Sequence, residues 1–241
     1  MALPKINEHL KFTMEIPSTG KKVKYRPYLV KEEKVLLQAF ESRDMKTCLE
    51  AMCDTLQHCI SDKDNIKVSE LPTFDLEYMF LKVRSKSVGE TSELHIKCNE
   101  CSEENPYFLD LDKVKLDYEP KSNVFAITKD IKIEMKYPNY HMISKMEISQ
   151  EDESSEGEME SAIEMLSECL VAVHTEDERI DCSQQTKEEI ITFISSMTSE
   201  QMKLVSDYLN KMPTLEHTIN FKCKKCEADN EINLKGLADF F

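Results

Sequence analysis

Apolar and polar residues alternate with two different periods along the chain, which predicts short strands separated by amphipathic helices. Steps of three and four residues place Met52, Leu56, Cys59 and Ile60 on one stripe, as on the buried face of a helix. A period of two occurs on both sides of each Cys-x-x-Cys motif, as in half-buried strands. Pro72 marks the boundary before another helical stripe. That stripe consists of Leu76, Met79, Phe80 and Val83.

Two capping boxes predict further helices towards the C-terminus. Thr186 is followed by Glu189, and Thr198 by Gln201, at the spacing with which side chain and backbone cap each other. Pro213 ends the second of these helices. Their apolar residues are Ile190, Ile191 and Ile194, then Leu204, Val205, Tyr208 and Leu209.

Three landmarks occur twice in the same order, which predicts an internal duplication. The fold class expected is α+β, with two related halves over residues 1–116 and 117–241. Each half would run strand, helices, strand, Cys-x-x-Cys knuckle, strand. The alternative is two unrelated α+β stretches that share common patterns. The matched segments are 23–28 with 135–140 (both tyrosines aligned), 52–60 with 162–170, and 94–101 with 219–226.

The two Cys-x-x-Cys pairs predict one structural zinc site. This spacing lets two thiolates reach one tetrahedral Zn²⁺ from a tight turn, and a structural site takes four ligands. Cys98 and Cys101 supply one pair, and Cys223 and Cys226 the other. A single ion would therefore join the two halves, as in a zinc ribbon. The 121 residues between the pairs do not forbid this, because loop-closure cost grows only logarithmically with length.

Other readings of the cysteines stay open. A redox pair needs a thiolate stabilised by a helix N-terminus, whereas both pairs lie between strand-like segments. A vestigial pair without metal is a further alternative, because Ser102 and Glu227 stand where a knuckle usually has glycine. His95 and His217 are candidate substitute ligands, against the simpler reading as strand or loop histidines. Three other cysteines lie on apolar stripes and are expected in the core: Cys53, Cys59 and Cys169.

Charge disfavours a nucleic-acid partner. The formal net charge is -15, and affinity for nucleic acid comes largely from neutralising phosphates with Lys and Arg. Residues 1–34 are an exception, with eight Lys or Arg against four acids. The alternative function is a zinc-ribbon regulator that binds nucleic acid, to which Lys222, Lys224 and Lys225 would contribute.

A run of acids covers residues 147–160, with seven Asp or Glu and no base. Such a composition predicts a solvated loop or linker. The alternative is an acidic docking site for a basic partner.

The chain offers neither a membrane span nor a catalytic motif. No apolar run approaches the roughly 20 residues that cross a bilayer, and the N-terminus lacks the apolar core of a signal peptide. Phosphate loops, nucleophile elbows and His-Glu-x-x-His are absent from the sequence. A protein of a reducing cytoplasm without enzymatic activity is expected, and a thiol–disulfide enzyme is a further alternative.

Five blocks of the sequence are distinctive, at residues 2–6, 16–34, 74–90, 212–217 and 236–241. They resemble the T4-like baseplate hub assembly protein family. The resemblance implies a non-enzymatic tail protein that helps to build the central hub of the baseplate, either as a minor subunit or as a chaperone. Its partners would be other hub and tail proteins. It would act in the host cytoplasm during assembly, with the baseplate of the virion as a further location.

Two segments are candidate contact surfaces for such partners. One is the basic stretch from Ser18 to Lys34, and the other is the apolar tail with Leu237, Phe240 and Phe241. In each case the alternative is internal packing, as a strand edge or as a tail on its own core.

Overall fold

The protein forms two compact units. A computed structural model describes residues 11–42, 44–61, 65–116, 118, 122–145 and 155–240. Unit 1 comprises Met1–Tyr118 with Pro213–Phe241, and unit 2 comprises Glu119–Met212. The chain passes from unit 1 to unit 2 after Tyr118, two residues beyond the boundary expected after residue 116. The C-terminal segment, however, packs with unit 1 instead of with the rest of the expected second half. The units are described separately below.

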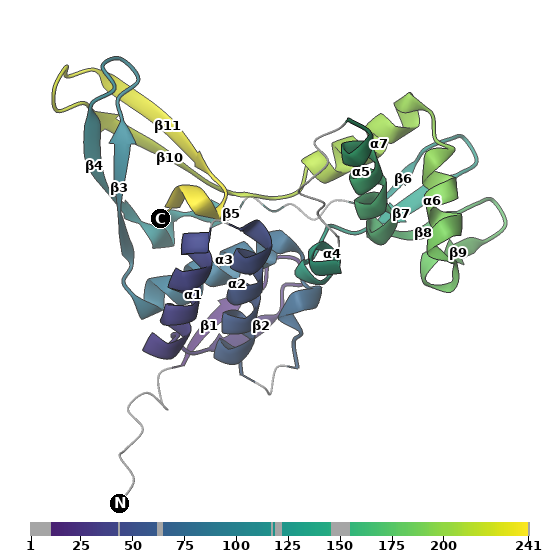
Figure 1. Cartoon of the computed structure of the whole chain (residues 1–241), viewed down its shortest axis with the longest axis horizontal. Coiled ribbons are helices and arrows are strands. Elements are labelled where there is room, and N and C mark those ends of the chain that lie inside the picture. Colours follow the sequence, from purple (N-terminus) through teal and green to yellow (C-terminus); the bar gives the residue numbers. More distant parts are fainter. Residues whose placement is uncertain are drawn as a thin grey trace, which may run out of the picture. The chain divides into compact units, whose positions relative to one another are not determined.

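The first part of unit 1 packs three helices with a β-hairpin (Figure 1). Periodicity correctly predicts the second and third helices, since Met52, Leu56, Cys59 and Ile60 are all buried. Pro72 is the N-cap of the third helix. The elements are β1 (Phe12–Glu15), β2 (Lys22–Tyr25), α1 (Val30–Ser42), α2 (Met45–Cys59), the 3-10 helix η2 (Val68–Glu70) and α3 (Thr73–Ser87).

Two antiparallel hairpins form an arm of unit 1 (Figure 1). Along β3 every second residue is buried, as the period of two predicts. β10 also pairs with β5, through Leu215 with Leu116, and this pairing joins the C-terminal segment to the rest of unit 1. The elements are β3 (Thr91–Lys97), β4 (Glu104–Asp110), η3 (Leu111–Lys113), β5 (Lys115–Leu116), β10 (Leu215–Lys222), β11 (Asp229–Lys235) and η5 (Leu237–Phe240).

Unit 2 packs helices on a four-stranded antiparallel sheet of order β6-β7-β8-β9. Both predicted capping boxes are confirmed, with Thr186 at the start of α6 and Thr198 at the start of α7. The core includes Ile133, Cys169 and Ile194. The elements are β6 (Val124–Ala126), β7 (Lys132–Met135), α4 (Tyr140–Lys145), α5 (Ser155–Cys169), β8 (Leu170–His174), β9 (Arg179–Asp181), η4 (Cys182–Gln184), α6 (Lys187–Ser195) and α7 (Ser199–Asn210).

The acid run corrects one expectation. Residues 155–160 do not form a loop, because α5 begins at Ser155 and runs to Cys169. Acidic residues are in general common at helix starts, so an acidic composition does not by itself indicate a loop. Composition alone therefore misassigns this part of residues 147–160. Residues 147–154 lie outside the described residues.

The two candidate contact segments make internal contacts in unit 1. Phe240 is fully buried and Leu237 is largely buried, so internal packing is correct for these two tail residues. Phe241 lies outside the described residues. In the basic segment, Ser18 donates its N–H to Asp75 (3.0 Å) and Arg26 binds Glu32 (2.7 Å). Part of that segment therefore serves the fold of unit 1.

The observed mixture of helices and small sheets agrees with the α+β class. The relation between the two halves stays a prediction. Among the described helices, none is long and apolar enough to cross a membrane.

Candidate metal centre

Each Cys-x-x-Cys motif forms a tight turn at the tip of a hairpin. The first turn connects β3 to β4, and the second connects β10 to β11. In the first, the Cys98 N–H donates to the Glu103 carbonyl (2.9 Å) and the Ser102 N–H donates to the Cys98 carbonyl (3.0 Å). The second turn has the equivalent two hydrogen bonds. The Cys223 N–H donates to the Ala228 carbonyl (2.9 Å), and the Glu227 N–H donates to the Cys223 carbonyl (3.0 Å).

Both turns form without the glycine that is usual after the second cysteine. Ser102 has a φ of 57° and Glu227 a φ of 58°, so both occupy the left-handed region. A non-glycine residue there costs roughly 1–2 kcal/mol. The turn geometry that the sequence left in doubt is therefore present, and it stores local strain.

The four thiols converge on one point. The Sγ atoms of Cys98 and Cys226 are 3.6 Å apart, those of Cys101 and Cys223 are 3.7 Å apart, and all four lie within 4.8 Å of one another. Four sulfurs at about 2.3 Å from a tetrahedral Zn²⁺ would be about 3.8 Å apart. The thiols therefore lie at metal-binding distance, and the donor set is one that zinc prefers.

The thiols ionise unequally, because they receive different hydrogen bonds from the backbone and from one another. The backbone N–H of Cys101 donates to the Cys98 sulfur and lowers its pKa. The backbone N–H of Cys226 does the same for Cys223 and lowers its pKa to about 6. For Cys226, the N–H of Ala228 favours the thiolate, but hydrogen bonds shared with the neighbouring thiols raise the pKa to about 12. A bound cation would favour ionisation of all four.

Asn105, which lies on β4, reaches across to the second knuckle. Its Oδ1 accepts the backbone N–H of Lys224 (2.9 Å), and its Nδ2 donates to the Cys223 sulfur (3.7 Å). The same Nδ2 donates to the carbonyl of Glu103 within its own hairpin (2.8 Å).

Asn230, which lies on β11, makes the same contacts in the opposite direction. Its Oδ1 accepts the N–H of Asn99 (2.8 Å), its Nδ2 donates to the Cys98 sulfur (3.5 Å), and the Nδ2 also donates to the Ala228 carbonyl (2.9 Å). Sequence reasoning identified neither contact. The available signal is that each asparagine follows the first cysteine of its own knuckle by seven residues.

The surroundings of the knuckles are of mixed charge. Lys225 binds Glu103 (3.0 Å), with Lys224 at 3.8 Å from the same carboxylate. The pair with Lys225 lowers the pKa of Glu103. Two of the lysines that could contact phosphates are therefore paired with an acid, which weakens the case for nucleic-acid binding.

The remaining predicted candidates fall outside this centre. Within the described ranges, the ligand group that could hold one ion consists of the four thiols and includes neither His95 nor His217. Cys53, Cys59 and Cys169 are buried, as expected, and burial raises the pKa of each to about 12. These thiols therefore behave as core residues.

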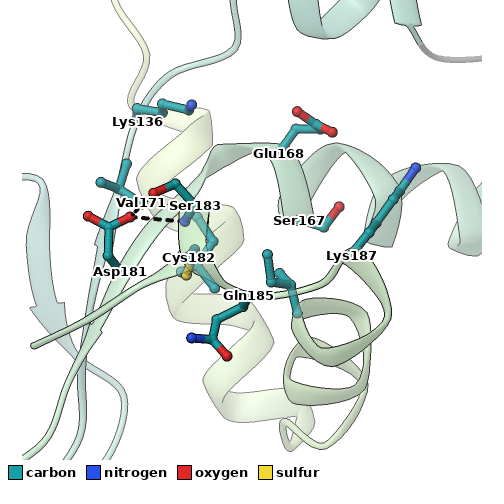
Figure 2. A pocket seen from close by; sticks show the side chains of 11 residues that line it. Lys136, Ser167, Glu168, Val171, Asp181, Cys182, Ser183, Gln185 and Lys187 are labelled. Carbon is teal, nitrogen blue, oxygen red and sulfur yellow. Dashed lines mark hydrogen bonds between the residues drawn. The ribbon is translucent and has the colours of Figure 1, made fainter.

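Unit 2 contains a pocket of about 390 Å³ that the sequence did not predict (Figure 2). Its charges include Lys136 and Lys187, and Lys187 is paired with Glu164. Asp181 accepts the N–H of Ser183 (2.9 Å), so this carboxylate already has a partner. Burial raises the pKa of the Cys182 thiol, which disfavours a nucleophile. The pocket lining thus gives no evidence for catalysis.

Comparison with known proteins identifies one family. Residues 8–241, nearly the whole chain with both knuckles, match the family model described as T4 bacteriophage base plate protein. No curated protein and no solved structure matches the chain.

Proposed function

The chain belongs to the family of T4 bacteriophage base plate proteins, and we propose that it helps to assemble the central hub of the baseplate. In this proposal it acts without catalysis, through contacts with other hub and tail proteins. It meets them in the host cytoplasm during assembly, and the virion baseplate is its final location. The observation that carries the proposal is the family match, since it covers nearly the whole chain.

We also propose that Cys98, Cys101, Cys223 and Cys226 hold one structural Zn²⁺. The support is the distances of 3.6 and 3.7 Å between sulfurs of opposite knuckles. A closed four-thiolate set is typical of structural rather than catalytic zinc. When bound, the ion would supply a cross-link between the two hairpins and would contribute on the order of 10 kcal/mol to folding.

The proposed duplication has support from equivalent backbone contacts. The Arg26 N–H donates to the Cys59 carbonyl (2.9 Å), and the Lys136 N–H donates to the Cys169 carbonyl (2.8 Å). Each member of the second pair follows its counterpart by 110 residues (26 to 136 and 59 to 169). Helices α2 and α5, each of 15 residues, end at these cysteines.

These contacts support a strand register for the proposed duplication that differs from the one expected from the sequence. A displacement of 110 residues puts Tyr25 opposite Met135, two residues from the register that aligns Tyr25 with Tyr137. In this proposal the strand-to-helix contact, rather than the residue type, defines which residues correspond.

A complementation experiment tests the assembly role. A phage that lacks this gene is grown in cells that express the wild type, Cys98→Ser or Cys48→Ser. Cys48 is the matched control because it lies on α2, outside the metal group. We expect complete baseplates and one zinc per purified chain for the wild type and the control, and neither for Cys98→Ser. Normal baseplates without any form of the protein would refute the assembly role.

A binding assay at low salt distinguishes the assembly role from the alternative function of a nucleic-acid-binding regulator. Filter binding with duplex and single-stranded DNA is expected to show no retention, because the chain carries a net charge of -15. Salt-sensitive retention would favour the nucleic-acid regulator instead. Co-purification of hub proteins with the tagged chain from infected cells would favour the assembly role.

A further inference from the structure

Asn105 and Asn230 are two buried polar side chains that cross between the two knuckles. They are only 4% and 3% exposed, so their amide groups need partners inside the protein. Each amide group makes hydrogen bonds inside the protein, and the pattern of these bonds is the same for both asparagines. The oxygen accepts from the backbone of the opposite knuckle, and the nitrogen donates to the first cysteine of that knuckle.

We propose that Asn105 and Asn230 are positioning residues of the metal centre, each stabilising a metal-bound thiolate of the opposite hairpin. The inference rests on the proposed four-thiolate site and extends it beyond the ligands. The cation it serves is a tetrahedral, thiolate-preferring ion such as Zn²⁺.

The chemical reason lies in the charge of the site. Four thiolates around a divalent cation leave two excess negative charges in a partly buried place. An N–H donor pointing at a thiolate offsets part of that charge, and hydrogen bonds to ionised groups are stronger than neutral ones. Outer-shell donors of this kind also fix the orientation of the ligands.

The crossed arrangement adds a second effect. Because the amide belongs to one hairpin and the sulfur to the other, neither hairpin makes these bonds alone. The amide oxygens hold Asn99 and Lys224 by their backbone N–H groups, and these bonds do not involve a sulfur. The asparagines therefore align the two cysteine pairs before an ion enters.

Substitution by aspartate separates the two effects. Asn105→Asp and Asn230→Asp keep the size and one oxygen acceptor, but they replace the N–H donor with a second oxygen. Asn230→Ala removes donor and acceptor without adding a charge, and so serves as a second variant. Asn233→Ala is the matched control, since Asn233 is exposed on the same strand, β11.

Cobalt(II) is the probe, added to the reduced, metal-stripped full chain. We expect tetrahedral cobalt–thiolate spectra for the wild type and the control. We expect the Asp and Ala variants to bind cobalt about 10- to 100-fold more weakly in competition with a chelator. Their sulfur-to-cobalt charge-transfer bands should shift to lower energy, because a thiolate without its N–H donor gives up electrons more easily. Circular dichroism at saturating cobalt checks that each variant is folded.

Two outcomes would overturn the inference in distinguishable ways. Wild-type affinity and an unshifted band in both Asp variants would refute the role of the asparagines and leave the metal site standing. Absence of cobalt binding by the wild type would refute the metal site itself, and the inference with it.

Discussion

The sulfur atoms of Cys98 and Cys226 lie 3.6 Å apart although the two residues are 128 positions apart in the chain. The chain between them contains the whole of unit 2, Glu119–Met212. Unit 2 is thus inserted between two knuckles that belong to unit 1. An ion at the thiols would close this long loop at an entropic cost that depends only weakly on its length.

Metal removal is therefore expected to loosen unit 1 selectively. A strong chelator under reducing conditions should increase amide hydrogen exchange in β3, β4, β10 and β11, because their tips lose the cross-link. Exchange in the sheet of unit 2 should stay unchanged, since its core contains none of the four ligands. Mass spectrometry of peptides from both units measures the difference. Equal loss of protection in both units would contradict the prediction.

Glycine at either strained turn position should stabilise the protein. Glu227→Gly removes the cost of a non-glycine residue in the left-handed region, which is roughly 1–2 kcal/mol. Glycine also makes the unfolded chain more flexible, which lowers the stability by up to about 1 kcal/mol. The net gain in the free energy of unfolding should be about 0.5–1 kcal/mol, and Ser102→Gly should behave alike. Lys224→Gly is the control, because Lys224 lacks a positive φ and should only lose stability. Denaturant titration measures all three, and a loss for Glu227→Gly would show that its side chain matters more than its backbone.

The carboxyl group of Asp75 should make unit 1 less stable as the pH rises. Burial raises its pKa to about 6, against the opposing effect of the hydrogen bonds from Ser18. Between the unfolded pKa of about 4 and the folded pKa, the folded state binds more protons, so stability falls with increasing pH. The loss reaches about 3 kcal/mol above pH 6.

The variant Asp75→Asn isolates the effect of ionising this carboxyl group on stability. It cannot ionise, so its stability relative to the wild type should increase between about pH 4 and pH 6 and then level off. Denaturant titrations at several pH values give the comparison, and Ser18→Ala is the control that keeps the carboxyl group. A pH-independent difference between Asp75→Asn and the wild type would rule out the raised pKa.

The sequence predicts local features of this fold better than their assembly. Helical spacing identifies α2 and α3, and Thr186 and Thr198 mark the starts of α6 and α7, because these signals act within one or two turns. Composition fails at residues 155–160, since an acidic stretch can be a solvated loop or a helix start. The return of residues 213–240 to unit 1 depends on the pairing of Leu215 with Leu116, which no local pattern encodes.

The cluster of four cysteines shows the same division between local and long-range features. Ligand spacing alone was enough to predict that Cys98, Cys101, Cys223 and Cys226 would meet, since two half-sites need each other. The roles of Asn105 and Asn230 depend on which side chains cross between the hairpins. That requires the mutual orientation of two distant segments, and the equal spacing of the asparagines only hints at it.

Phe240, the last residue of η5, should contribute to the stability of unit 1. It is 0% exposed, and truncation of a buried Phe to Ala typically costs about 3–5 kcal/mol. Phe240→Ala should lower the free energy of unfolding by this order, with the loss confined to unit 1. Phe108 is 67% exposed on β4, so Phe108→Ala is the matched control and should change stability by at most about 0.5 kcal/mol. Denaturant titration compares the two. A small effect at Phe240 would reopen the tail as a docking element for another tail protein, and a large one at Phe108 would mean that its exposed ring is covered by a partner surface such as a second copy.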